Sequence, residues 1–530
     1  MLTNSILQVQ QMWDVSNRNA PQLQSSVELE GSYLAARMIQ GRAYVVVQTF
    51  PAWIIPYRDR ADEKTLRSAS PLFRTLTPAV AENKKQRGDV PFQAVKSRCD
   101  QLGRLTGLGD LSTWITVLAT DADKARSTYG TWNSVTHAGR GGTVYVSTQR
   151  IYVASTTYDY ARPKPSAPIP NEDAPKPRSG VWSAILTFDL NSGAPTFGGL
   201  AEVDGSIINQ FALDEFNGYL RVATTKGEMW ATPTTSESLI TVLDQDLGRV
   251  GLLSGLAPGE RIYSVRFMGQ RGYVVTFRQV DPFFVFDLSQ PASPQLLGYL
   301  KIPGFSDYLH PLDATHMLGV GKDTVEVGER VSTKGVKLSL FNVADPENPQ
   351  EEAVLVLGDS GTTTEVSYDH KAFLYHQGSG VIALPIDLHQ VERCPDKTPR
   401  TQGGACPGST DWGPSTFQGA YVLYLEGTDQ KRFSVRGRIT HEHLKGVRND
   451  AADTSRVMFG LWGGWDWRQS LRRVYRSIYM DGHLYTLSDR HMQAHLLDTM
   501  EEKAVLNWTT PVCYPAQVYA NGNSFGIAVP

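Results

Sequence analysis

The chain alternates apolar and polar residues in short runs that are broken by turn residues. Such a run repeatedly ends at Gly, Asn or Asp and is followed by a second run that an aromatic or aliphatic residue opens. Two-residue periodicity interrupted by tight turns predicts antiparallel hairpins. Their recurrence about every 40 to 55 residues predicts radial repetition, as in a β-propeller. The clearest copies are Arg37–Val47, Phe211–Val222, Val265–Val275, Ile478–Tyr485 and Val518–Phe525.

A second recurring segment places an Asp or Asn at the end of a strand and a Pro several residues later. Clean copies begin at Asp14, Asp287 and Asn342, and a looser copy begins at Asp189. The Asp or Asn side chain can cap the turn, and Pro restarts the chain in an extended conformation. We interpret this segment as the connection between the third and fourth strands of a blade.

The predicted strands divide into blades along the whole chain. Residues 6–30 contain only an outer strand pair and residues 514–530 only an inner hairpin, so we predict that together they complete the first blade. The expected fold is all-β, a single β-propeller domain over residues 1–530 with eight four-stranded blades, or seven as the alternative. The other blades centre on residues 34–135, 136–204, 205–254, 261–301, 305–357, 362–440 and 473–508.

Four long insertions interrupt the repeat. In a four-stranded meander, the second-to-third and blade-to-blade connections lie on one face, and the insertions fall in that set. Loops on one rim of a rigid scaffold are where such folds place recognition. We therefore predict that the insertion-bearing face binds a partner. The insertions lie at about residues 50–110, 156–181, 388–417 and 441–472.

The last insertion contains the candidate binding residues. Trp462, Trp465 and Trp467 lie among glycines, with Arg468 and Arg472 behind them. Exposed indoles there could stack on a sugar ring or fill a pocket of a partner protein. The alternative is that they fold inward and close the loop against the propeller, since Trp is usually mostly buried.

Charge and hydropathy narrow the choice of partner. The chain has 51 Lys and Arg residues and 54 Asp and Glu residues, which gives a net charge of −3 at pH 7. This balance produces no strong field toward nucleic acid or an anionic membrane. The sequence lacks an 18-residue apolar run and the basic and apolar parts of a signal peptide. We therefore expect no nucleic-acid partner, no membrane span and no signal segment in this chain.

The cysteines favour an oxidising compartment. Cys394 and Cys406 lie in one loop rich in Pro, Gly and Thr, where a disulfide would join a segment that has no core of its own. A zinc knuckle would require paired Cys-x2-Cys ligands, so the spacing favours the disulfide. A second bridge, between Cys99 and Cys513, would require two distant segments to meet. An even cysteine count in this arrangement indicates an extracytoplasmic location.

Several segments resemble one known family. They run from near residue 10 to near residue 510, so the likeness covers nearly the whole chain. The chain is similar to the secreted bacterial and archaeal "β-propeller domain" proteins, which carry an extra hairpin and a signal or lipoprotein segment before this point. The resemblance implies an exported propeller with no assigned reaction. The segments are Asp14–Leu23, Val27–Ile39, Ile208–Thr225, Asp369–Leu374, Val435–Glu442 and Arg476–Tyr485.

Motifs for catalysis and metal binding are weak. His441 and His443 would share one face of a strand, and so would His491 and His495, but without a third nearby ligand we interpret them as surface polar residues. The sequence has no Gly-x-Ser-x-Gly, His-Glu-x-x-His or phosphate-loop motif. We therefore expect no cofactor and no metal.

Together these features predict an extracytoplasmic, non-enzymatic scaffold or binding protein whose insertion-bearing face binds a protein or a cell-surface glycan. The alternative is a hydrolase or lyase that acts on a polysaccharide or lactone in the central funnel of the propeller. Two carboxylates, or three His and carboxylate groups, pointing into the funnel would favour the enzyme. A Trp-bearing rim without such a cluster would favour the binding protein.

Overall fold

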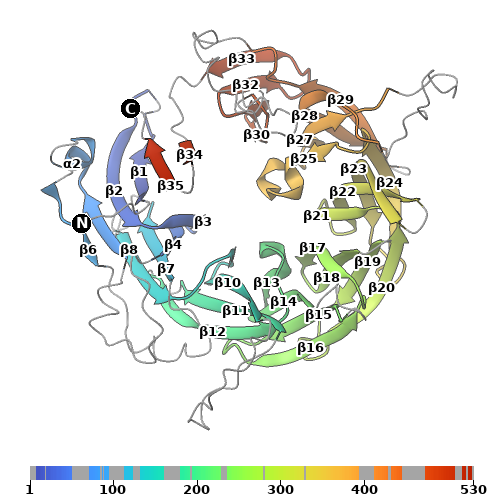
Figure 1. Ribbon diagram of the computed structural model, residues 1–530, viewed down its shortest axis with the longest axis horizontal. Coiled ribbons are helices and arrows are strands. Elements are labelled where there is room, and N and C mark those ends of the chain that lie inside the picture. Colours follow the sequence, from blue (N-terminus) through green and yellow to red (C-terminus); the bar gives the residue numbers. More distant parts are fainter. Residues whose placement is uncertain are drawn as a thin grey trace. The chain divides into compact units, whose positions relative to one another are not determined.

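A computed structural model shows a chain built almost entirely of antiparallel β-strands (Figure 1). The chain divides into two units, residues 1–278 with 282–299 and residues 279–281 with 300–530, and each is described by itself. The structure describes residues 7–527 apart from 18, 51–70, 84–85, 87–88, 95–112, 123–131, 160–179, 191–193, 228–234, 278–280, 328–329, 393–410, 428–430, 445–471, 508–515 and 521–522.

The first unit contains four four-stranded sheets and nearly all of a fifth, whose last two strands cross the boundary. A short helix, α2 (Pro78–Glu82), follows β5, and a 3-10 helix, η1 (Gln210–Ala212), precedes β13. In hydrogen-bonded order, the first sheet consists of β1 (Leu7–Asp14), β2 (Gln22–Glu30), β5 (Leu72–Leu76) and β6 (Gln93–Ala94), and the second of β3 (Ser32–Ile39), β4 (Arg42–Thr49), β7 (Trp114–Asp121) and β8 (Trp132–Ala138). The third sheet consists of β9 (Thr143–Val146), β10 (Arg150–Asp159), β11 (Gly180–Asp189) and β12 (Thr196–Asp204), and the fourth of β13 (Leu213–Phe216), β14 (Tyr219–Lys226), β15 (Glu237–Leu243) and β16 (Arg249–Leu256). The fifth sheet consists of β17 (Arg261–Met268), β18 (Arg271–Phe277), β19 (Asp281–Asp287) and β20 (Gln295–Ile302).

The second unit contains a four-stranded sheet, a five-stranded sheet, another four-stranded sheet and a two-stranded hairpin. Two 3-10 helices, η2 (Glu365–Ser367) and η3 (His370–Ala372), precede β26. The sheets are β21 (Phe305–Pro311), β22 (His316–Val327), β23 (Arg330–Asn342) and β24 (Gln350–Leu357); β25 (Thr363–Thr364), β26 (Leu374–His376), β27 (Val381–His389), β28 (Ser415–Glu426) and β29 (Arg432–Ile439); β30 (Arg476–Met480), β31 (His483–Leu487), β32 (His491–Leu496) and β33 (Glu502–Asn507); and β34 (Ala516–Ala520) with β35 (Asn523–Ile527).

The predicted hairpin turns form at the predicted residues. Asn217 and Gly218, between β13 and β14, have φ angles of 51° and 80°, and Asp481 and Gly482, between β30 and β31, have φ angles of 49° and 74°. Two successive positive φ angles match the right-handed twist of the flanking strands, and Asn, Asp and Gly adopt them at the lowest cost. This conformational requirement explains why the turn residues recur in the sequence.

The predicted Asp and Asn caps also form. The side-chain oxygens of Asp14, Asp287 and Asn342 each accept a hydrogen bond from the backbone N–H two residues later, at 3.0, 2.9 and 3.0 Å. Each cap ends the third strand of a predicted blade or, at Asp14, the first strand of the chain. Local hydrogen bonding thus sets where these strands stop.

The hydrophobic core lies between neighbouring sheets. In the first unit one cluster combines Tyr152, Val222, Val265 and Phe286, which come from three successive sheets. The middle strands are covered on both faces, and β7 is buried along its whole length. This double burial explains why such strands are apolar runs without clean alternation.

The first sheet differs from the sequence-based prediction. Residues 72–94, assigned above to an insertion, supply β5 and β6, and β5 pairs with β2 so that Arg74 lies opposite Glu28. The C-terminal hairpin forms as predicted, but β34 and β35 make a two-stranded sheet of their own. A buried ion pair between Arg74 and Glu28 accounts for the docking of β5.

Candidate binding cleft

A cleft of about 610 Å³ lies among the first hairpins of three successive sheets in the first unit. It is lined by Arg37–Ile39 of β3, by Tyr145–Gln149 at the end of β9 and the following turn, and by Glu215 and Asn217–Gly218 of the next hairpin. Among the described lining residues, Glu215 carries the one carboxylate and Arg37 the one guanidinium. We call this the Glu215 cleft.

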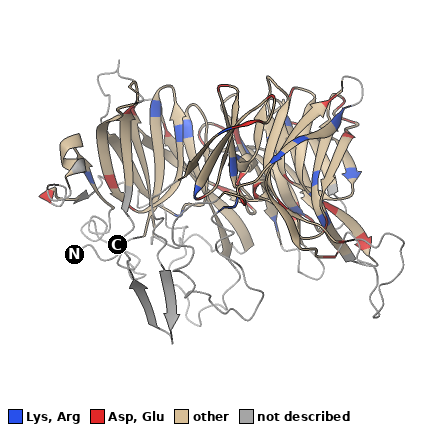
Figure 2. Cartoon of the chain, turned by 90° about the horizontal axis from the view of Figure 1, so that it is seen from above, with Lys and Arg blue, Asp and Glu red and all other residues tan. Residues whose placement is uncertain are grey.

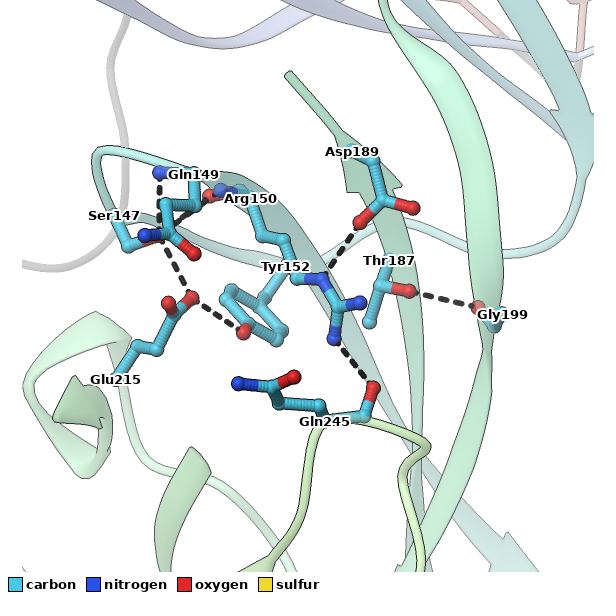
Figure 3. A network of polar contacts seen from close by, with 9 residues as sticks. All are labelled: Ser147, Gln149, Arg150, Tyr152, Thr187, Asp189, Gly199, Glu215 and Gln245. Atoms are coloured by element: carbon cyan, nitrogen blue, oxygen red, sulfur yellow. Dashed lines mark hydrogen bonds and ion pairs between the residues drawn. The ribbon is translucent and has the colours of Figure 1, made fainter. Parts of the chain in front are cut away.

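Two hydroxyl groups hold the Glu215 carboxylate in place (Figure 3). The Tyr152 hydroxyl donates a hydrogen bond to Glu215 Oε2 at 2.6 Å, and the Ser147 hydroxyl donates one to the same oxygen at 2.8 Å. Ser147 Oγ itself accepts from the N–H groups of Gln149 and Arg150 at 3.1 and 2.9 Å. The Ser147 hydrogen has two acceptors within reach, and Glu215 Oε2 at 2.8 Å is closer than the Arg150 carbonyl at 3.4 Å.

A third hydroxyl contacts the backbone of the same residue. The Glu215 N–H donates to the Tyr145 hydroxyl oxygen at 2.9 Å. Burial raises the pKa of Tyr145 to about 12, and the nearby Asp214 and Glu215 carboxylates act in the same direction. Burial and the hydrogen bond to Glu215 raise the pKa of Tyr152 as well. Both tyrosines therefore keep their hydroxyl hydrogens at neutral pH.

The turn that carries Ser147 is tied to the sheets beside it. Arg150, which follows the turn, donates from Nε to Asp189 Oδ1 of β11 at 2.6 Å and from Nη1 to the Gln245 carbonyl at 2.7 Å (Figure 3). The first contact lies within the sheet that carries Ser147, and the second joins this sheet to the turn between β15 and β16 of the neighbouring sheet. A site supported by such contacts holds its polar groups in one geometry.

Comparison with known proteins identifies the fold family. The profile of the family described as Beta propeller domain matches residues 4–500. The chain belongs to this family. The match confirms the resemblance found in the sequence, and the eight sheets of four or five strands agree with eight predicted blades rather than seven.

Two archaeal relatives of this β-propeller are themselves uncharacterized proteins. One, from Methanocaldococcus jannaschii, is 42% identical over 203 residues, which are 38% of this chain and 30% of that protein. The other, from Archaeoglobus fulgidus, is 46% identical over 201 residues, which are 38% of this chain and 29% of that protein. The matched segment therefore covers less than a third of each of these relatives.

Solved structures similar to this β-propeller are distant from it in sequence. The crystal structure of Saccharomyces cerevisiae Sqt1 is 8% identical, with a TM-score of 0.28, over 65% of this chain and 86% of that one. The β-propeller domain of the Trilobed protease from Pyrococcus furiosus is 9% identical, with a TM-score of 0.33, over 91% of this chain and 97% of that one.

Most of the binding and disulfide residues predicted from the sequence lie outside the described part of the propeller. These are Trp462, Trp465, Trp467, Arg468, Cys394, Cys406, Cys99 and Cys513. Arg472 is described, and its Nη1 donates to the Glu442 carbonyl at 3.4 Å. The binding role of the tryptophans and the disulfides therefore stay predictions.

Three of the four histidines predicted to be surface polar residues are instead buried, whereas His443 is exposed as predicted. His441, His491 and His495 are 0%, 3% and 7% exposed. His441 exchanges hydrogen bonds with the hydroxyls of Ser488 at 2.9 Å and Thr486 at 3.0 Å, and its ring centre lies 6.1 Å from that of His491. Within the described ranges, no three His, Cys, Asp or Glu side chains are placed to hold a metal ion. The sequence spacing does not reveal the packing that covers these three side chains.

Charge and helix length add two observations about the propeller. Lys and Arg residues are interspersed with Asp and Glu residues over the strands, in keeping with the small net charge (Figure 2). Where the chain is described, no helix is both long enough and apolar enough to cross a bilayer.

Proposed function

We propose that this β-propeller is a non-enzymatic binding protein that acts outside the cytoplasm and recognises a glycan at the Glu215 cleft. The observation that carries this proposal is the lining of the cleft, which presents hydroxyl, amide, carboxylate and guanidinium groups together. Each sugar hydroxyl both donates and accepts hydrogen bonds, so a lining with both kinds of group suits it. Apolar side chains of Met38, Ile39 and Val146 complete the lining and suit the C–H faces of a sugar ring.

The size of the cleft supports a ligand of a few rings at most. Its volume of about 610 Å³ falls within the range of roughly 300 to 1,000 Å³ that is typical of small-molecule sites. The terminal one or two units of a glycan chain fit this range. A longer chain would continue over the open side of the cleft.

The chemistry of the cleft favours binding over hydrolysis. Most glycoside hydrolases use two carboxyl groups about 5 to 10 Å apart, one on each side of the scissile bond. The described lining contributes Glu215 alone, with Oε2 already engaged by Tyr152 and Ser147. A carboxylate held by two hydroxyl donors acts as a fixed acceptor.

The extracytoplasmic location is part of the proposal and rests on the sequence. Cys394 and Cys406 lie in a loop that a disulfide would stabilise, and disulfides persist outside reducing compartments. The tryptophan-bearing insertion remains a second candidate surface of the same protein. The insertion and the cleft share no residues, so separate variants can distinguish the two surfaces.

The proposal is tested with protein isolated from its native source. We expect it in the extracytoplasmic fraction, and we expect the purified protein to capture neutral glycans on an array. Glu215→Gln, which keeps an acceptor oxygen for Tyr152 and Ser147, should lose this capture at a nearly unchanged melting temperature. The triple variant Trp462→Ala, Trp465→Ala, Trp467→Ala should retain the capture. A native protein that stays in the cytoplasm, or captures no glycan, would contradict the proposal. Loss of capture in the triple variant alone would move recognition to the insertion.

A further inference from the structure

The Glu215 carboxylate and the Tyr145 hydroxyl can each form a further hydrogen bond with a ligand in the Glu215 cleft. Glu215 Oε2 accepts two hydrogen bonds, from Tyr152 and Ser147, whereas no described residue bonds to Oε1. The Tyr145 oxygen accepts from the Glu215 N–H, and among the described residues its own hydrogen has no acceptor. The cleft therefore offers one fixed acceptor and one fixed donor.

The donor and the acceptor are attached to the same point of the fold. The Tyr145 oxygen lies 2.9 Å from the backbone nitrogen of Glu215, and the carboxylate of that residue is anchored by its two hydroxyl donors. Both residues line the cleft. A ligand that meets one of these groups can therefore meet the other without rearrangement of the protein, which lowers the entropy cost of binding.

We infer that Tyr145 and Glu215 together recognise two adjacent hydroxyl groups of a neutral sugar. Glu215 Oε1 accepts from one hydroxyl, and the Tyr145 hydroxyl donates to the oxygen of its neighbour. This inference rests on the proposed function and names the ligand class and the two residues that determine specificity. Vicinal hydroxyls supply the matching donor and acceptor on a single ring.

The charges of the lining favour a neutral sugar over an acidic one. Glu215 and Arg37 contribute one negative and one positive group to the described lining. A uronic acid would bring a second carboxylate toward Glu215, and like charges at short range oppose binding. A neutral ring avoids this repulsion. The Arg37 Nη1 donates to the Ala36 carbonyl at 2.8 Å, and the remaining N–H groups of the guanidinium can donate to a ring hydroxyl.

Ser147 and Tyr152 act as positioning residues in this arrangement. They fix the carboxylate so that Oε1 is presented in one orientation. Loss of either hydroxyl should weaken sugar binding less than loss of Glu215 itself, since the carboxylate still lines the cleft but is no longer held in a single orientation.

The inference is tested by calorimetry with methyl hexopyranosides of the gluco, galacto and manno series and their monodeoxy analogues. For the best-bound glycoside we expect Glu215→Gln to weaken binding about tenfold or more, and Tyr145→Phe about three- to tenfold. The matched controls Tyr33→Phe and Glu202→Gln, which change exposed residues of the same unit, should bind as the unaltered protein does. Melting temperatures are recorded for all variants.

Deoxy analogues make the test specific to the pair of hydroxyls. Removal of the hydroxyl that Tyr145 contacts should weaken binding to the unaltered protein but not to Tyr145→Phe, because the interaction is already absent. Variants that bind every probe as the unaltered protein does would overturn the inference, while glycan capture on the array would leave the proposed function standing. Stronger binding of n-butylammonium than of any sugar, abolished in Glu215→Gln, would also overturn it in favour of a lysine-bearing protein partner.

Discussion

Lowering the pH from 7 to 4 should destabilise the second unit by about 2 to 3 kcal/mol through His441. Burial, with a smaller contribution from the nearby His491, His443 and His495, lowers the pKa of His441 to about 4. In the unfolded chain a histidine titrates near 6.5. Between these two values the unfolded chain binds a proton that folded His441 does not bind, so unfolding becomes more favourable as pH falls.

The pH window of this effect follows from the same two pKa values. The contribution of neutral His441 to the unfolding free energy is fully present above pH 6.5 and is lost as the pH falls through about 4. Burial also lowers the pKa of His491, with Arg472 and Arg490 adding to the shift, and the pKa of His495, where Glu502 opposes it. His491 and His495 therefore add to the loss of stability at low pH.

The measurement is the unfolding free energy in urea across pH 4 to 8. His441→Gln should be less stable than the unaltered protein at pH 7 and should show a shallower dependence on pH. His483→Gln, on β31 in the sheet that carries His491 and His495, is the matched control and should keep the full dependence. An identical pH dependence in His441→Gln and the unaltered protein would show that the buried cluster does not control acid stability.

Replacing Arg74 by Ala should cost about 3 to 5 kcal/mol of stability in the first unit. The Arg74 guanidinium lies 2.7 Å from the fully buried Glu28 carboxylate, donates to the Val90 carbonyl at 2.9 Å and stacks 4.3 Å from the ring centre of Phe92. Removal of the guanidinium leaves the Glu28 carboxylate buried without it, and this lowers the unfolding free energy far more than loss of an exposed ion pair does.

An exposed ion pair in the same unit provides the control for this prediction. Lys226 and Asp204 are 3.3 Å apart and 46% and 43% exposed, so Lys226→Ala should change the unfolding free energy by less than about 1 kcal/mol. The double variant Glu28→Gln, Arg74→Met should recover much of the loss, since no charge remains buried. Equal stability of Arg74→Ala and Lys226→Ala would mean that β5 does not dock on β2.

The fold could be predicted because its signals are local. Asn217 with Gly218, and Asp481 with Gly482, specify hairpin turns through their own backbone preferences, and Asp287 caps its turn through its own side chain. Each of these features is complete within a few residues of sequence. The blade boundaries followed from them without knowledge of tertiary contacts.

The Glu215 cleft could not be predicted because it depends on contacts between sheets. Ser147 is 68 residues from Glu215, and Tyr152 is 63 residues from it. In the sequence Ser147 is an ordinary turn residue, and Tyr145 and Tyr152 are ordinary strand residues. The docking of β5 escaped prediction for the same reason, because the partner of Arg74 is Glu28, which is 46 residues away.

Binding of a sugar in the Glu215 cleft is tested most directly by a crystal structure of the protein with the best-bound methyl hexopyranoside. We predict the ring in the cleft, with one hydroxyl within hydrogen-bonding distance of Glu215 Oε1 and the neighbouring hydroxyl within that distance of the Tyr145 oxygen. A sugar bound only at another surface, or an empty cleft at a concentration well above the measured Kd, would contradict the proposal.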